Sequence, residues 1–502
     1  MLALAFGLAL TGCGGTTGVS APPGPPPAAP TLTSTEVQQL VQKGAEAADS
    51  TTMVIAVVDR AGRILAVFRK PAAPAMSTGN FGALVDTNEL AVSLARTAAF
   101  FSNDQAPLSS RTVRFISGIH FPPGVSFTPN AALYGIENTN RGCTLSTNYI
   151  PGREVPPARS ISGATTGLGI ATGKADTNDS DPNAVNPGGV PLFKNGRVVG
   201  GIGVAGVTGD VAEFAGFSSA VANGFGASPA PPGVVVIDGI ALPFVNQTTR
   251  PAGVGPGNFV GSFLVGPLAS PGPPPEGDLV APAAGPIGGL TAAEVRQILD
   301  NAIATANQTR AVIRLPLGSR TRMAIAVADL DGTIIGMNRM PDTTVFSIDV
   351  AVTKARNMVY FSSLSRTAAD LTEVPMGTAV TNRTISFGAQ PLYPPGIDGT
   401  LLGPFFDLYQ RDVTNPCTQG FQSGVPNVNK SGIVFFPGSV PLYRNGVLVG
   451  GLGISGDGVE QDDFVAAGGA VGFEAPAAIR ADQVIVRGVR LPYLKFPRNP
   501  TE

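Results

Sequence analysis

The stretch GGVPLFKNGRVVGGIGVAG (188–206) decides the fold, because it returns without a gap as GSVPLYRNGVLVGGLGISG (438–456). In both stretches an Asn-Gly pair separates two apolar runs, which is the preferred signal for a type I′ β-hairpin. The second run of each is rich in glycine, and a strand with few side chains lets another backbone or a flat ligand approach closely. We therefore expect two equivalent hairpins, each ending in a strand of small residues.

The rest of the chain repeats in the same order. The matching pairs are LTSTEV (32–37) with LTAAEV (290–295), MVIAVVD (53–59) with MAIAVAD (323–329), LAVSLARTAAFFS (90–102) with VAVTKARNMVYFS (350–362), RTVRFISGIHFPPGV (111–125) with RTISFGAQPLYPPGI (383–397), and GIALPF (239–244) with GVRLPY (488–493). A repeat of such long period predicts two copies of one unit. We place the copies at 31–245 and 290–502, and the Gly/Pro-rich residues 246–289 are expected to form a linker.

Each copy has the pattern of a mixed unit. Thr33 and Glu36 have capping-box spacing, as have their counterparts in the second copy, and this spacing predicts the start of a helix. A strand, a return strand and an Ala-rich helix follow; after an insert come the glycine-containing hairpin, a short acidic helix and a last strand (234–238 or 483–487). This order predicts an α+β fold, in which each antiparallel sheet has helices packed on one side.

Composition excludes several classes of protein. Of the 502 residues 43% are hydrophobic, which is ample material for packed cores despite 64 glycines and 46 prolines. Charged residues make up 14% and the formal net charge is −2, so the sequence offers no electrostatic footprint for nucleic acid. Three cysteines, one histidine and no tryptophan exclude zinc fingers, iron–sulfur clusters and disulfide-scaffold folds.

The N-terminus has the features of an export signal. Residues 1–13 are apolar and end in LTGC, which has the form of a lipobox and resembles a bacterial lipoprotein signal in which Cys13 is lipidated. The charged region that usually precedes the apolar run is absent, which leaves open a start upstream. Residues 14–30 are expected to be a Pro/Gly-rich tether. We expect the cell envelope, with Gly14 favouring an outer membrane facing the periplasm or the cell surface; the alternative is an ordinary cleaved signal with an incidental cysteine.

The motifs IAVVDRAGRILAVFR (55–69), ARTAA (95–99) and GGVPLFKNGRVVGGIGVAGVTGD (188–210), with their second-copy counterparts, resemble the GlcG/HbpS-like family, the haem-degrading or DUF336 domain. The resemblance implies two tandem PAS- or profilin-like domains and a link to haem or tetrapyrrole binding. Both copies depart from the family by their long inserts, at 102–187 and 364–437. The first copy also has Leu94 where the family usually has Lys.

The resemblance implies a ligand site where the glycine-rich strand meets the Ala-rich helix. The residues that it suggests for ligand binding are Arg96, Thr97, Lys354, Arg356, Gly188 and Gly189. An Arg or Lys there could hold a propionate or another carboxylate. The alternative is a salt bridge on the helix face, to an acid such as Asp86, Glu89 or Asp349. The acids of the short helix, Glu213, Glu460 and Asp462, either act as acids or, as we favour, interact with its N-terminal dipole.

Three further features are weighed against simpler interpretations. His120 is the one histidine that could be an axial haem ligand, but its counterpart is Leu392, which favours a structural role. Cys143 and Cys417 lie in matching contexts and could form a disulfide if the copies pair; two free thiols are the alternative. The acidic residues 176–181 lack the glycine and glutamate of a calcium loop, so a solvated loop is favoured.

These observations favour an exported, lipid-anchored protein that binds haem or a related tetrapyrrole. Its partners would then be haem, a membrane through the lipid anchor, and proteins that contact the inserts. The alternative is an envelope structural or interaction module without a small-molecule ligand. An enzyme ranks third, because no nucleophile–base pair is visible in the sequence.

Overall fold

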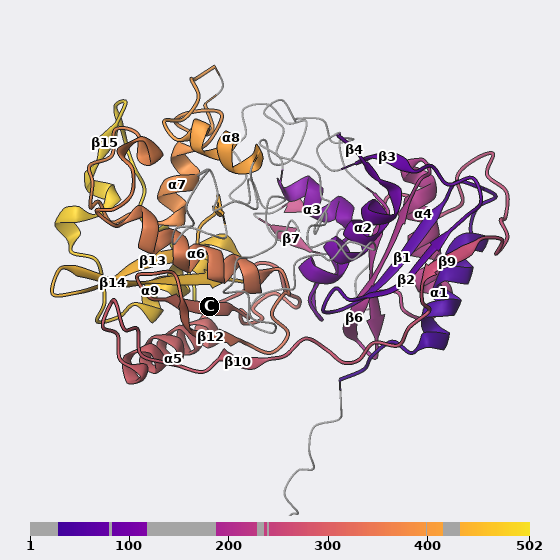
Figure 1. Cartoon of the computed structure of the whole chain (residues 1–502), viewed down its shortest axis with the longest axis horizontal. Coiled ribbons are helices and arrows are strands. Elements are labelled where there is room, and N and C mark those ends of the chain that lie inside the picture. The colour runs from indigo at the N-terminus through magenta and orange to yellow at the C-terminus, as the bar shows by residue number, and fades with distance from the viewer. Residues whose placement is uncertain are drawn as a thin grey trace, which may run out of the picture.

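The computed structural model describes residues 29–79, 83–117, 187–227, 235–237, 240–397, 399–414 and 432–502. Within them, two five-stranded antiparallel sheets form two units, which stand side by side with the first on the right in Figure 1. The α+β class with antiparallel sheets is therefore confirmed.

The first unit is built around a sheet with strand order β5-β6-β1-β2-β9. Its elements are α1 (Ser34–Glu46), β1 (Val54–Asp59), β2 (Ile64–Arg69), β3 (Met76–Gly79), β4 (Ala83–Asp86), α2 (Thr87–Phe101), α3 (Ser110–Ser117), β5 (Gly189–Lys194), β6 (Arg197–Ala205), α4 (Gly209–Ala222), β7 (Val236–Ile237), β8 (Ile240–Ala241) and β9 (Ser262–Val265). Strands β3 and β4 form a separate hairpin that leads into α2.

The second unit repeats this sheet in the order β13-β14-β11-β12-β10. Its elements are β10 (Gly277–Val280), α5 (Ala292–Gln308), β11 (Ala324–Ala328), β12 (Ile334–Arg339), α6 (Ser347–Phe361), α7 (Asn382–Gly388), α8 (Phe406–Thr414), β13 (Ser439–Arg444), β14 (Val447–Ser455), α9 (Val459–Gly469), β15 (Ile485–Val486) and β16 (Val489–Arg490). Register is shared too, since Val57 pairs with Ile202 where Val327 pairs with Leu452. The two halves therefore have one architecture.

Helices cover both faces of each sheet, which corrects the expectation that they pack on one side. In β1 the side chains of Val54, Ala56 and Val58 belong to the core beneath α2, whereas Ile55 and Val57 belong to the core beneath α1 and α4. All six residues of β1 are buried. An uninterrupted apolar strand indicates burial on both faces, whereas alternation indicates one, so the sequence carried this signal.

The glycines of β6 serve the packing of α2. A Cβ atom on Gly201 would lie 2.2 Å from the carbonyl oxygen of Ala95, and one on Gly203 would lie 2.1 Å from that of Ala91. Gly451 and Gly453 of β14 have the same relation to α6. Of the two expected uses of these glycines, the close approach of a backbone is therefore the one present along this part of the strand.

The Gly/Pro-rich stretch 246–289 contributes a strand to each sheet. Strand β9 pairs with β2 at the edge of the first sheet, and β10 pairs with β12 at the edge of the second. The expected last strands lie elsewhere, because β7 pairs with β8 and β15 with β16 in small hairpins outside the main sheets. The outer position beside β2 and β12 is taken by strands of the connecting stretch.

The two units share a core where the C-terminal end of α2 meets the segment before α6. The rings of Phe101 and Phe346 stack with their centroids 4.1 Å apart, and the amide of Val345 donates to the carbonyl of Phe100. Asn103 Nδ2 donates to the Ile313 carbonyl at 3.0 Å. One cluster of buried apolar residues continues from α2 to α6 across this junction, so the units form a joined body.

Several predicted features lie outside the described residues. They are the signal 1–13, residues 14–28 of the tether, His120, Cys143, Cys417 and the acidic loop 176–181. The lipid anchor, the disulfide and the histidine ligand therefore stay predictions. In the described part of the chain, no helix is both long and apolar enough to cross a membrane.

Candidate functional site

A pocket of about 670 Å³ lies in the first unit, between the β3–β4 hairpin, α2 and the end of β6. It is lined by Thr52, Ser77, Thr78, Gly79, Leu90, Leu94, Pro187, Val204, Ala205, Gly206, Val207, Thr208, Gly209 and Ala212. Its size is in the range of small-molecule sites in proteins. It lies where the glycine-containing strand ends beside the Ala-rich helix.

The lining of this pocket mixes apolar side chains with the hydroxyl groups of three threonines and a serine. Leu90 and Leu94 come from α2, Val204 from the end of β6, and Ala212 from the first turns of α4. The polar side chains are those of threonines and a serine, and Ser77 Oγ lies 2.8 Å from Thr87 Oγ1 in a hydrogen bond. Among the lining residues that the structure describes there is no ionisable side chain. Such a surface suits a ligand that presents both apolar and hydrogen-bonding groups and keeps its charged groups at the mouth.

In the second unit the corresponding space holds a buried ion pair. Lys354 lies on α6 where α2 has Leu94, and Asp462 lies on α9 where α4 has Ala212. Lys354 Nζ donates to Asp462 Oδ2 at 3.0 Å and to the Ile454 carbonyl at 2.7 Å, and it lies 4.6 Å from the ring centroid of Phe436. Lys354 is 0% and Asp462 2% exposed.

Burial changes the protonation of this pair. Removal from water raises the pKa of Asp462 to about 7, against the opposing effect of the Lys354 ammonium group. The same burial lowers the pKa of Lys354, again against the attraction of its partner. The second oxygen of the carboxylate, Oδ1, has no hydrogen-bond partner within the described structure. A charged pair so placed depends on both members being present.

The equivalent glycines before β5 and β13 show that the two spaces correspond. A Cβ atom on Gly188 would lie 3.1 Å from Ala212 Cβ and 3.6 Å from Leu94 Cδ1. On Gly438 it would lie 2.5 Å from Asp462 Cβ and 2.6 Å from Lys354 Nζ. Both glycines have positive φ, of 115° and 117°. The same backbone corner thus faces an apolar pair in one unit and an ion pair in the other.

A second ion pair covers the same region of the second unit. Asp457 stands where the first unit has Val207, and its carboxylate bonds to the Nε of Arg314 and to the amide of Arg322. Arg314 is buried, and its guanidinium group also contacts Asp342 Oδ2 at 2.6 Å. Arg314 belongs to the residues between α5 and β11, which are longer than the connection between α1 and β1. This longer connection packs over the second unit's space.

Acids of α4 and α9 form ion pairs, and Glu460 and Asp462 also lie in the first turn of α9, where the interaction with the helix dipole was expected. Glu213 Oε1 accepts from Arg111 Nε at 2.7 Å, and Asp463 holds Arg383 in the equivalent place. Glu460 pairs with Lys495 near the surface. The Arg111 and Arg383 pairs tie α3 and α7 to the helix that follows the hairpin. Because both units have this contact, it is part of the common framework.

The arginines suggested by the family resemblance hold the first hairpin of each unit. Arg96 Nε donates to the Gly62 carbonyl and Arg356 Nε to the Gly332 carbonyl, both at 2.9 Å. Both side chains are buried, and burial lowers the pKa of Arg96 to about 10. The Thr97 hydroxyl donates to the Ser93 carbonyl one turn earlier in α2. None of the three lines the pocket, and their role in ligand binding stays a prediction.

The two glycines suggested for binding have different surroundings. Gly189 donates its amide to Ser110 Oγ at 3.0 Å, and a Cβ atom on it would lie 2.3 Å from the Leu94 carbonyl, so α2 covers it. Gly188 lies beside Leu94 and Ala212, which line the pocket. Of the suggested residues, Gly188 is thus the one that the structure brings next to the pocket.

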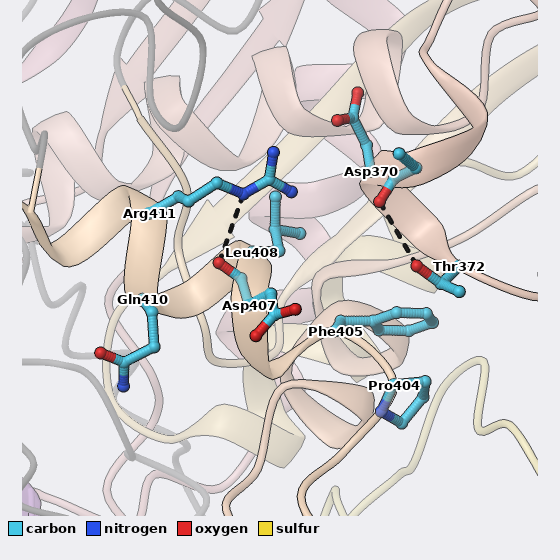
Figure 2. A pocket seen from close by; sticks show the side chains of 9 residues that line it. Asp370, Thr372, Pro404, Phe405, Asp407, Leu408, Gln410 and Arg411 are labelled. Atoms are coloured by element: carbon cyan, nitrogen blue, oxygen red, sulfur yellow. Dashed lines mark hydrogen bonds between the residues drawn. The ribbon is translucent and has the colours of Figure 1, made fainter.

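Another pocket, of about 480 Å³, lies in the insert of the second unit between α8 and the turn at Ala368–Leu371. Figure 2 shows Arg411 and Asp407 on one side of it and Asp370 on the other. Asp370 Oδ2 accepts a 2.5 Å hydrogen bond from Tyr360, and Arg411 Nε contacts the Asp407 carbonyl at 3.4 Å. The Asp370 carboxylate and the Arg411 guanidinium group are thus engaged with the protein.

Sequence reasoning missed Ala212 and its relation to Leu94. The signal was present in the sequence. The ungapped alignment of the two hairpins extends by a few residues, and in it Ala212 is the equivalent of Asp462. The change from Leu to Lys on one helix accompanies the change from Ala to Asp on the other. Arg314 has no counterpart in the first unit and gave no such signal.

Comparison with known proteins gives a family match over the second unit. Residues 290–470 match the family model described as "Haem degrading protein HbpS-like". None of the curated proteins compared with the chain matches it. The match spans the second unit from α5 to α9.

Two solved structures are among those similar to part of this chain. The crystal structure of a PduOC:heme complex is 23% identical, with 37% of this chain and 94% of that chain covered and a TM-score of 0.24. That of Klebsiella pneumoniae protein ORFY, whose title gives DUF336, is 20% identical, with 36% and 88% covered and a TM-score of 0.23. Scores this low support no inference about function.

Proposed function

We propose that the chain is an exported, lipid-anchored protein with two tandem HbpS-like units that binds haem or a related tetrapyrrole in the first of them. The observation that carries the proposal is the pocket of about 670 Å³ beside Leu94 and Ala212. The family match supports the ligand class, since the matched family is described as haem degrading. The shared strand order and register support two units of one kind.

The pocket fits the apolar part of a tetrapyrrole better than its metal. Leu90, Leu94 and Val207 provide apolar contact, and the described lining residues include no ionisable side chain, which would keep propionates at the mouth. The described lining residues include no His, Cys, Met or Tyr, so hydroxyl groups such as that of Thr208 are the described side-chain oxygens that could approach an iron. The haem would supply the metal and the redox chemistry; the residues here bind and enclose the ring.

Titration of the purified protein with hemin tests the ligand. We expect a saturable shift of the Soret band, and protoporphyrin IX without iron should bind with similar affinity because the described pocket contacts the ring. A titration without saturation would contradict the proposal. Binding of an apolar dye of similar size would not test this proposal, because the proposed ligand is a tetrapyrrole.

The lipid anchor has its own test. Labelling with radioactive palmitate in a bacterial host should mark the wild type and leave Cys13→Ala unmarked. Separation of inner and outer membranes then places the protein, which we propose lies in the outer membrane. Equal labelling of both proteins would contradict lipidation at Cys13.

A further inference from the structure

We infer that the chain binds one ligand, in the first unit, because residues 94 and 212 leave open a space that Lys354 and Asp462 fill in the second. The inference rests on the proposed function for the nature of the ligand. It adds the stoichiometry and the residues that decide which unit binds. These residues are Leu94 and Ala212 in the first unit and Lys354 and Asp462 in the second.

The first step is that the two pairs occupy one place in the fold. Both flank a glycine of positive φ directly before the hairpin, and the distances from that glycine are short in both units. In the first unit Leu94 and Ala212 border the pocket. In the second, Lys354 Nζ lies within hydrogen-bond distance of Asp462 and of the Ile454 carbonyl, whose counterpart, Val204, lines the first unit's pocket.

The second step is that exchanging only one member of either pair would leave a buried charge without a partner. Lysine alone beside Ala212 would be a buried cation without a partner, and aspartate alone beside Leu94 would be a buried anion. The chain contains the apolar combination once and the charged combination once. The two positions therefore change together, and a single exchange would leave an uncompensated charge in the core.

The third step is that the second unit is closed at a further point. Asp457 and Arg314 form their ion pair at the place of Val207, which lines the first unit's pocket. The amide of Val312 donates to the Asp457 carbonyl at 3.0 Å, and a Cβ atom on Gly458 would lie 3.2 Å from Val312 Cγ2. The segment that contains Arg314 thus lies against the turn that precedes α9. In the second unit, the Lys354–Asp462 pair therefore fills the space that the segment containing Arg314 covers.

The experiment rebuilds the second unit's pair in the first. In the Leu94→Lys/Ala212→Asp double variant the pocket should be filled, so the dissociation constant for hemin should rise at least tenfold. The wild type should bind one hemin per chain. Val221→Lys is the matched control, because it adds a charge to an exposed position of the same helix, α4, away from the pocket. It should bind hemin as the wild type does.

A second variant guards against misfolding of the first. Ala212→Met fills the pocket with an apolar side chain and adds no buried charge, so it should also weaken hemin binding at least tenfold. Circular dichroism and the melting temperature establish that each variant is folded. Two hemin molecules per wild-type chain, or binding within threefold of wild type by a folded filling variant, would overturn the inference.

A probe unrelated to haem separates this inference from the proposed function. The fluorescence of 8-anilinonaphthalene-1-sulfonate should increase on binding to the wild type and to Val221→Lys, and should fall by at least half in both filling variants. If hemin fails to bind to the wild type, the proposed ligand is wrong, and the dye alone decides whether the pocket is open in the first unit. Equal dye fluorescence in the wild type and the filling variants would overturn the inference.

Discussion

The first and second units have the same backbone arrangement, but the first keeps a pocket where the second has a filled space. Around Gly188 the first unit places Leu94 and Ala212 and keeps a pocket, whereas around Gly438 the second places Lys354 and Asp462 and fills the space. Strand order, register and the Arg111–Glu213 and Arg383–Asp463 contacts are common to both. The difference between the units therefore lies in a few side chains on a conserved frame.

Breaking the second unit's ion pair should have the largest effect on stability. Lys354→Leu alone leaves the Asp462 carboxylate buried without a partner, so the free energy of unfolding at pH 8 should fall by about 3–5 kcal/mol. Asp462→Ala alone should cost a similar amount. The double variant restores the apolar pair of the first unit and should recover more than half of the loss, which urea unfolding of all four proteins would measure. Additive losses would show that the pair is not coupled.

The pH dependence of stability should reveal the buried Asp462 carboxyl group. Its pKa in the folded protein is raised to about 7 from a usual value near 3.8, so between these values the folded state holds a proton that the unfolded state has lost. Its contribution to stability is therefore present at low pH and lost as the pH rises toward 7, by up to about 1.4 kcal/mol per pH unit.

Asp462→Asn removes this titration and serves as the reference. The difference in the free energy of unfolding between wild type and variant, measured from pH 4.5 to 7, should change in the direction that disfavours the wild type as the pH rises. A difference that stays constant over this range would contradict the burial of a titrating group. The first unit should contribute nothing comparable, because Ala212 stands in the equivalent place.

The hairpin arginines should have equal, smaller effects in the two units. Arg96→Met removes the hydrogen bond to the Gly62 carbonyl, and Arg356→Met removes the one to Gly332. Each should lower the free energy of unfolding by about 1–3 kcal/mol, with hemin affinity unchanged. Thermal unfolding together with hemin titration checks this. A hemin affinity at least tenfold weaker in Arg96→Met alone would instead assign Arg96 to the ligand.

The helix caps should have the smallest effect and should not distinguish the units. Thr33 and Thr291 each form a complete capping box at the start of α1 and α5. Thr33→Ala and Thr291→Ala should each cost about 1 kcal/mol of unfolding free energy. Urea unfolding of the two variants measures this, and costs that differ by more than twofold would show that the frames are less alike than their registers indicate.

Much of the fold could be predicted from sequence, because its signals are local. The capping boxes and the Asn-Gly hairpins appear at the residues where short-range patterns placed them, with positive φ at Asn195 and Asn445. The edge strands β9 and β10 could not be predicted in this way. They come from a Gly/Pro-rich stretch whose composition indicates a linker, and their pairing depends on a sheet edge left open by distant residues.

The pocket lies near the place where the sequence predicted a ligand site, and binding there stays a prediction. The meeting of the glycine-containing strand with the Ala-rich helix was predicted, and the pocket lies at its end, next to Gly188. Arg96 and Gly189 carried a clear pattern, yet they serve packing contacts with Gly62 and Leu94. The open pocket of the first unit differs from the filled space of the second by two residues. These two residues are far apart in the sequence, and only the folded chain brings them together.

A crystal structure of the protein grown with hemin tests the central claim most directly. The account predicts porphyrin density in the first unit, against Leu94 and Ala212, with the Lys354–Asp462 ion pair intact in the second unit and no porphyrin there. Porphyrin density in the second unit, with that ion pair displaced, would contradict it.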